Sequence, residues 1–158
     1  MNGAHRWALG ALVVILVVLD LVLRVGLGLG HFVPDLIVVA LLLAARQMRS
    51  GWAAGLGLLL GIVEGAVIPL TFGASALALA ILGFLGSRSR DLFSGDSPIF
   101  LAFYLFAGKW LYDILLHLIL LARAQPGSPS SLILVSPLMA LYAAAAGIAA
   151  YTAYRTLS

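Results

Sequence analysis

In one stretch of this chain, three polar residues recur at a spacing that could serve binding or proton transfer. Lys109, Asp113 and His117 follow one another at intervals of four residues, so a helix presents all three on one face. Lys109 and Asp113 can pair within that helix, which removes most of the cost of burying either charge in a membrane. We expect this ion pair, with His117 as a hydrogen-bonded neighbour. Snorkelling of Lys109 to the membrane interface, a carboxylate-binding site and a proton path are the alternatives.

Two further acidic residues lie inside apolar sequence. Asp20 precedes Arg24 by four residues, so we expect a local ion pair. Glu64 has no such partner nearby in the chain. We expect it to reach Lys109 or a hydroxyl group on another helix, or to stay protonated because burial disfavours the charged form.

A proline and an aspartate, Pro34 and Asp35, open another apolar stretch. A negative charge in the first turn favours the positive end of a helix, and proline is common at a helix start. We therefore expect Asp35 to cap this helix. Since a carboxylate inside a membrane protein is costly and often functional, a role in recognition is the alternative.

The composition excludes a soluble protein. Of the 158 residues, 63% are hydrophobic and 9% are charged, whereas a soluble domain carries about 25% charged residues. We expect a single integral membrane domain over residues 1–158. The absence of cysteine excludes disulfides and thiolate metal sites. The basic residues are scattered and form no stripe for nucleic acid.

The apolar stretches predict an all-α, polytopic protein with six transmembrane helices. Crossing a bilayer takes about 20 residues, and the candidate segments are 7–25, 32–45, 51–68, 74–86, 99–122 and 132–154. The second and fourth are short, and a glycine-rich run precedes the second. The first is longer than the apolar part of a signal peptide and has no cleavage site after it, so we expect it to remain as a helix.

The arginines predict the orientation. One side of the membrane would hold six of them and the other would hold two. The six are Arg6, Arg46, Arg49, Arg88, Arg90 and Arg155, and the two are Arg24 and Arg123. Since basic residues gather in cytoplasmic loops, both termini are expected in the cytoplasm.

Small residues form a ridge on the third segment. Gly57, Gly61 and Gly65 recur every four residues, a spacing that lets another helix approach closely. We expect a crossing within the chain; a groove for the transmembrane helix of a partner is the alternative. The stretch 140–150, with Gly147, offers a second such face with the same two interpretations.

Motifs of catalysis are missing from the sequence. It has no His-Glu-x-x-His pair, no Gly-x-Ser-x-Gly elbow and no phosphate-binding glycine loop ending in Lys-Ser or Lys-Thr. Its three histidines are too far apart to indicate a metal site. We therefore expect neither an enzyme nor a protein with a cofactor.

Several of these residues together resemble the rod shape-determining protein MreD family, over about residues 32–120. The matching residues are Pro34, Asp35, Leu36, Arg49 to Gly51, Gly57, Gly61, Glu64, Gly73, Ala76, Leu77 and Leu79, followed by the basic Arg88 and Arg90. The family commonly has an aspartate where this chain has Gly65. Either Glu64 supplies the acid here or that polar contact is lost.

The resemblance implies a scaffold of the bacterial cell-elongation machinery in the cytoplasmic (inner) membrane. Such a protein contacts membrane lipids and binds the bitopic protein MreC. Through MreC it would act on the peptidoglycan glycosyltransferase and transpeptidase, and so support cell-wall synthesis and rod shape. No nucleic acid is implied.

MreD-like proteins are also similar in fold to the S components of energy-coupling-factor transporters, so we expect an S-component-like bundle. Binding of a vitamin, as by an S component, is the alternative function. The outer loop at 69–73 is short, and the polar and aromatic residues that such a pocket needs are scarce. These features favour the scaffold.

Overall fold

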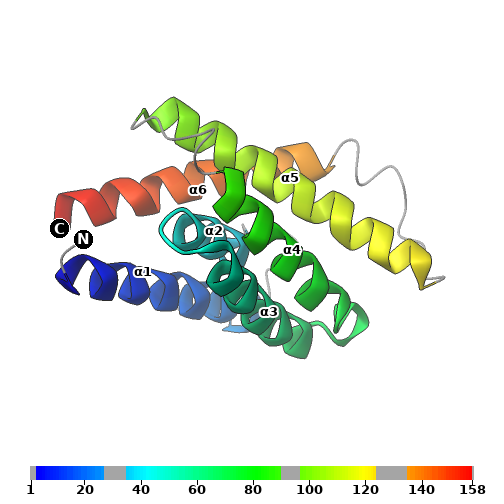
Figure 1. The fold of residues 1–158 in the computed structure, drawn as a ribbon. Coiled ribbons are helices and arrows are strands. Elements are labelled where there is room, and N and C mark those ends of the chain that lie inside the picture. The colour runs from blue at the N-terminus through cyan, green and yellow to red at the C-terminus, as the bar shows by residue number, and fades with distance from the viewer. Residues whose placement is uncertain (1–2, 27–34, 90–96, 124–134, 158) are drawn as a thin grey trace.

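A computed structural model describes residues 3–26, 35–89, 97–123 and 135–157. These residues form an all-α bundle of six α-helices, one for each apolar segment of the sequence (Figure 1). The helices are α1 (Gly3–Leu21), α2 (Leu36–Ala45), α3 (Ser50–Val67), α4 (Ala74–Arg88), α5 (Pro98–Ala122) and α6 (Ser136–Leu157). A π-helical segment, Val22–Gly26, extends α1, and a 3₁₀ turn, Pro69–Thr71, leads from α3 toward α4.

Four helices in the described part of the chain are long and apolar enough to cross a membrane. They are Trp7–Gly26, Ser50–Val67, Pro98–Ala122 and Ser136–Ala153, and they make the chain a multi-pass membrane protein. The other two are shorter. The 10 residues of α2 extend about 15 Å, roughly half the apolar thickness of a bilayer. The 15 residues of α4 extend about 22 Å.

The short helix α2 is the centre of the bundle. All of its residues are buried, and it contacts each of the other five α-helices (Figure 1). A helix that is apolar all round is stable when protein surrounds it on every side. Because its neighbours cover it, α2 need not be long enough to span the bilayer by itself.

The glycine ridge of α3 packs against α4, inside the chain. A Cβ atom on Gly57 would lie 2.1 Å from the carbonyl oxygen of Leu79, and one on Gly61 would lie 2.2 Å from the Cα of Ala76. On Gly65 it would lie 2.9 Å from the backbone of the turn before α4. Only glycine permits this approach. The internal crossing expected from the ridge is therefore confirmed.

The small-residue face of α6 also packs inside the chain. Ala140, Ala143 and Ala144 are buried there. A Cβ atom on Gly147 would lie 2.4 Å from the Cδ1 of Leu105 on α5. Both small-residue faces of the sequence thus serve internal packing.

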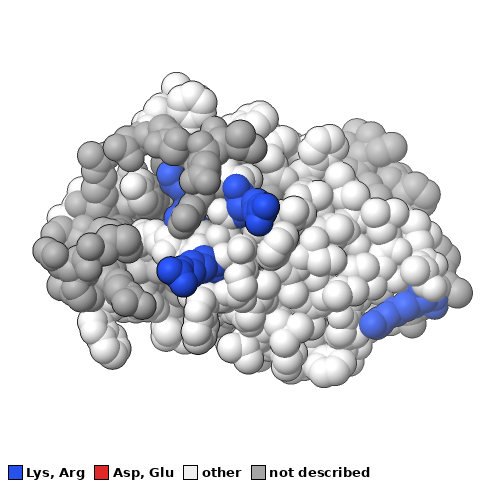
Figure 2. All heavy atoms as spheres, in the orientation of Figure 1, with Lys and Arg blue, Asp and Glu red and all other residues white. Residues whose placement is uncertain are grey.

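The two ends of the bundle differ. The N- and C-terminal ends of the chain lie toward the same end, at the left in Figure 1. The end of α2 lies there too, because Leu9 of α1, Arg46, Gln47 and Tyr151 of α6 line one small cavity of about 150 Å³. On the face shown in Figure 2, basic side chains are visible and acidic ones are not. The acidic side chains that the structure describes lie inside the bundle.

Candidate functional site

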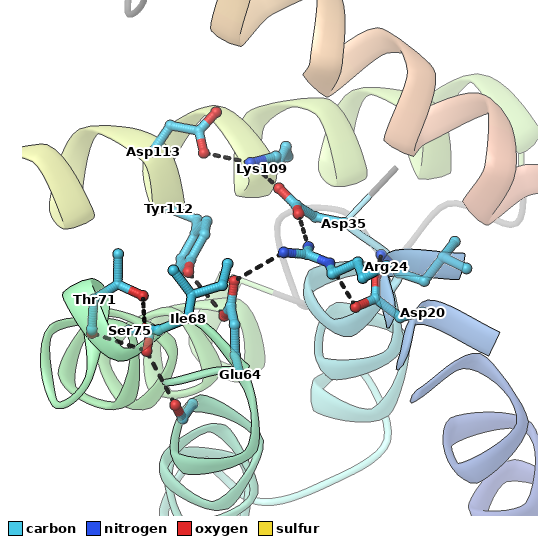
Figure 3. A network of polar contacts seen from close by, with 12 residues as sticks. Asp20, Arg24, Asp35, Glu64, Ile68, Thr71, Ser75, Lys109, Tyr112 and Asp113 are labelled. Atoms are coloured by element: carbon cyan, nitrogen blue, oxygen red, sulfur yellow. Dashed lines mark hydrogen bonds and ion pairs between the residues drawn. The ribbon is translucent and has the colours of Figure 1, made fainter. Parts of the chain in front are cut away.

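Charged side chains from four parts of the chain meet inside the bundle (Figure 3). They gather at the start of α2, whose other end lies toward the chain termini. We call them the ion network: Asp20 of α1, Arg24 of the π-helical segment, Asp35 before α2, Glu64 of α3, and Lys109 and Asp113 of α5. Four of the six acidic residues of the sequence take part. Along the path from Asp20 to Asp113, acidic and basic groups alternate.

Asp20 pairs with Arg24 and also caps another helix. The Nε of Arg24 lies 2.8 Å from Asp20 Oδ2, which confirms the expected local pair. The second oxygen, Oδ1, accepts a hydrogen bond of 2.9 Å from the backbone N–H of Leu36, the first residue of α2. A carboxylate at this end of a helix satisfies a free N–H group and the helix dipole together. The side chain of Asp20 is fully buried.

Asp35 stands at the N-cap position of α2, yet its side chain makes no capping hydrogen bond. The expectation that it caps its own helix is therefore wrong. Its two carboxylate oxygens pair with Arg24 and with Lys109. Asp20 already accepts from the first N–H of α2, which leaves Asp35 free for the two cations. Pro34, the other member of the motif, lies outside the described residues.

Lys109 lies between two carboxylates. It pairs with Asp113, as expected from their spacing, and also with Asp35. Asp113 accepts a further hydrogen bond from the hydroxyl of Ser136, the first residue of α6. His117, one turn further along α5, is partly buried and is not among the described contacts of the network. Its expected role as a hydrogen-bonded neighbour stays a prediction.

Glu64 is satisfied by a hydroxyl group. The hydroxyl of Tyr112 donates to Glu64 Oε2 over 2.9 Å, while Glu64 Oε1 lies 3.9 Å from an Nη atom of Arg24. Of the partners expected for Glu64, the hydroxyl is the correct one, because Lys109 is engaged elsewhere. The neighbouring Gly65 packs against the turn after α3, so an aspartate there would require that turn to move. Glu64 is the acidic side chain at this level of α3, and its replacement of the family's aspartate stays a prediction.

The ion network connects several helices of the bundle. Its contacts join the end of α1 with α2, α3, α5 and the start of α6. In the described part of the chain, no group of three histidine, cysteine, aspartate or glutamate residues is arranged to hold a metal ion. Buried ion pairs can specify how elements fit together even where they add little net stability. Fixing the register of the helices is the role that this geometry fits.

The backbone conformation of the turn between α3 and α4 explains the glycine at position 73. Gly73 has a φ of 78°, a left-handed conformation that glycine adopts without strain. The guanidinium of Arg123, at the end of α5, donates a hydrogen bond of 3.0 Å to the carbonyl of the neighbouring Phe72. The turn is thereby attached to α5.

Three participants were not identified from the sequence as parts of one site. Arg24 was assigned to Asp20 alone, although it also reaches Asp35 and Glu64. Tyr112 lies three residues after Lys109, a spacing that places the two on neighbouring parts of one helix surface, and this signal could have found it. Ser136 gave no such signal, since its partner lies 23 residues away in the chain.

The residues that carry the family resemblance thus fall into two structural groups. The first is the glycine crossing of α3 and α4, and the second is the ion network. Of the other described matching residues, Arg49, Gly51, Leu77 and Arg88 belong to neither group and are exposed. No family model, curated protein or solved structure matches this chain.

Proposed function

We propose that the chain is an MreD-like scaffold of the bacterial cell-elongation complex. It would bind a bitopic MreC-like protein in the cytoplasmic membrane and so support peptidoglycan synthesis and rod shape. The observation that carries the proposal is that residues matching the family contact one another in space. Gly61 of α3 packs on Ala76 of α4, for instance, although 15 residues separate them in the sequence.

The acidic residues of the resemblance support the same conclusion. Asp35 and Glu64 lie on different helices, and both reach Arg24. Both therefore share one largely buried cation, the kind of partner that carboxylates inside a membrane protein require. Asp35, Glu64 and the glycines of α3 lie inside the bundle, on different elements, so this part of the resemblance extends beyond one short motif.

A membrane scaffold needs a well-packed interior and an outer surface on which the helix of a partner can pack. The two small-residue faces and the ion network occupy the interior here. Outward, Val14, Ile15 and Val18 of α1 and Val22 of the π-helical segment are at least half exposed. These residues form one apolar stripe along the helix. A partner helix would pack on an outer face of this kind, since the glycine ridge of α3 is already filled.

The same proposal includes six membrane passages in an S-component-like bundle, with both termini in the cytoplasm. The chain ends lie toward one end of the bundle, as an even number of passages requires. Arg46 follows α2 and Arg88 ends α4, and positive charge of this kind marks cytoplasmic loops. The short α2 would complete its passage within the cover of its neighbours.

Vitamin binding, as in the S components, is the second candidate. One observation favours it: the ion network lies away from the termini, in the half of the bundle that the arginine bias assigns to the outside. However, its groups pair with one another, and Glu64 and Lys109 are only 6% and 4% exposed. Polar groups that satisfy each other leave little for a ligand to bind, so the scaffold is the better supported function.

The test is co-expression of the tagged chain with the MreC-like protein of the same cell. A photo-crosslinking residue is placed in turn on the outward faces of α1, α5 and α6, at Val18, Trp110 and Leu141. All three are at least 45% exposed. The proposal predicts a crosslink to the partner from one of these faces. Leu41 of α2, which is fully buried, is the matched control position and should give none.

Two results would contradict the scaffold. One is the absence of any crosslink and of a complex in detergent, with an unrelated single-span protein as the reference for background. The other is a vitamin that co-purifies with the chain and is identified by mass spectrometry. The second result would favour the S-component alternative directly.

A further inference from the structure

A second feature of the molecule lies away from the ion network, between α4 and α5. A cavity of about 390 Å³ opens between these helices and reaches Leu42 of α2. Its floor is made by buried residues, among them Leu42, Leu82 and Tyr104, and its sides by Leu85, Ala107 and Leu111. We call it the α4–α5 groove. Its charged residue, Arg88, lies at one end together with Ser89.

Small residues create the groove and keep its wall apolar. Gly86 and Gly108 line it, and a Cβ atom on Gly108 would lie 2.5 Å from a methyl group of Leu42. The hydroxyl of Tyr104 lies 3.1 Å from the carbonyl oxygens of both Leu42 and Gly86. The polar atom of the tyrosine is thus satisfied within the wall, and its ring adds apolar surface to the floor.

Positive charge gathers at the end of the bundle where the groove holds Arg88. Arg88 is exposed in the last turn of α4. The guanidinium of Arg46, at the end of α2, lies 5.9 Å from the centroid of the Tyr104 ring, on which the groove is built. The acidic side chains that the structure describes all belong to the ion network. Arg46 lines the other cavity rather than the groove, so a negatively charged group in the groove would be attracted chiefly by Arg88.

The size and charge of the groove select one kind of occupant. A transmembrane helix about 10 Å wide and about 30 Å long occupies roughly 2,000 Å³, several times the space of about 390 Å³ in the groove. Small-molecule sites of about 300–1,000 Å³ are common, and this one is a narrow apolar space with a cation at its end. We propose that the α4–α5 groove binds one acyl chain of an anionic phospholipid, whose phosphate group lies at Arg88. Basic sites between membrane helices bind such headgroups on the cytoplasmic side.

The test uses the purified full-length chain, stripped of lipid in detergent and titrated with phosphatidylglycerol. Native mass spectrometry counts the lipids that remain bound. One phosphatidylglycerol should bind more tightly than phosphatidylcholine with the same acyl chains. Arg88→Gln should weaken this binding about fivefold, since one basic residue near a charged lipid contributes on the order of 1 kcal/mol. Ala107→Phe, which places a ring in the groove, should abolish it.

Arg49→Gln is the matched control, because Arg49 is also exposed at this end of the bundle but does not line the groove. It should change the affinity less than Arg88→Gln does. Equal losses from the two variants would mean general attraction to a basic surface and would overturn the proposal. Equal binding of the two lipids, or displacement of the lipid by inorganic phosphate alone, would overturn it as well. If Ala107→Phe does not fold, the comparison of Arg88→Gln with Arg49→Gln still tests whether the lipid phosphate lies at Arg88.

Discussion

At the scale of single residues, each charge of the ion network depends on more than one neighbour. Lys109 has a carboxylate on each side, Asp35 and Asp113, and Arg24 reaches Asp20, Asp35 and Glu64. Taking charges out of water is costly, and the cost is offset only when each charge keeps its partner. A single substitution therefore affects the network more than the removal of a complete pair.

Lys109→Met should destabilise the chain by about 3–5 kcal/mol, the usual cost of removing one partner of a buried ion pair. Asp113 would keep only the Ser136 hydroxyl, and Asp35 would keep only Arg24. The double variant Lys109→Met/Asp113→Leu should recover most of this loss, because it removes a complete pair. The measurement is unfolding of the purified protein by denaturing detergent, with Arg49→Gln, at an exposed residue, as a control near the wild-type value.

A double variant no more stable than Lys109→Met would contradict this compensation. The pairing with Asp35 would then be the one that matters. Lys109→Met/Asp35→Asn tests that outcome directly, since it removes the link between α5 and the start of α2.

The comparison of Asp20 with Asp35 explains what sequence can say about such residues. Spacing along one helix gave the pairs Asp20–Arg24 and Lys109–Asp113, because i and i+4 positions are neighbours in any helix. The sequence did not indicate that Asp20, rather than Asp35, caps the start of α2. A carboxylate 16 residues earlier in the chain caps that helix, and only the packing of α1 on α2 brings it there.

At the scale of elements, apolar length was enough to place all six helices of the described chain. The expected segment 51–68 became α3, Ser50–Val67, and 99–122 became α5, Pro98–Ala122. The clearest difference is in the second segment, expected at 32–45, where α2 begins only at Leu36. Hydropathy does not say where a buried helix starts, whereas the hydrogen bond from the first N–H of α2 to Asp20 marks the start here.

The crossing of α3 and α4 yields a prediction with an internal control. Gly61→Leu should destabilise the isolated chain, because even its Cβ atom would lie 2.2 Å from the backbone of Ala76. Overpacking of this kind typically costs about 1–3 kcal/mol or more. Gly55→Leu, on the same helix, should have little effect, since a Cβ atom there meets nothing within 4 Å. Unfolding in detergent and size-exclusion profiles of both variants give the measurement.

A different result for Gly61→Leu would mean that the partner interface lies on the glycine ridge of α3. If the variant remained monodisperse and as stable as Gly55→Leu but no longer bound the MreC-like protein, the ridge would face the partner. The internal packing of α3 on α4 would then be incorrect.

At the scale of the whole molecule, the two ends of the bundle have different chemistry. The end with the chain termini has exposed arginines and the α4–α5 groove. The ion network lies toward the other end, where Asp20 of α1 contacts the start of α2 and Asp113 contacts the start of α6. Since basic residues gather on the cytoplasmic side of membrane proteins, this difference predicts one direction in the membrane, with the end that carries Arg49 and Arg88 in the cytoplasm.

The expected orientation in the membrane can be tested with reporter fusions. Reporter fusions after Gln47, after Ser89 and at the C-terminus should all report the cytoplasm, because these sites lie at the end that carries the exposed Arg49 and Arg88. Fusions after Phe72 and after Arg123, which meet at the opposite end, are the matched controls and should report the outside. An outside signal at the C-terminus would mean an odd number of passages. A uniform reversal of all five reporters would instead keep the six passages and move the ion network to the cytoplasmic half. It would also remove the reason for expecting anionic lipid of the cytoplasmic leaflet at Arg88.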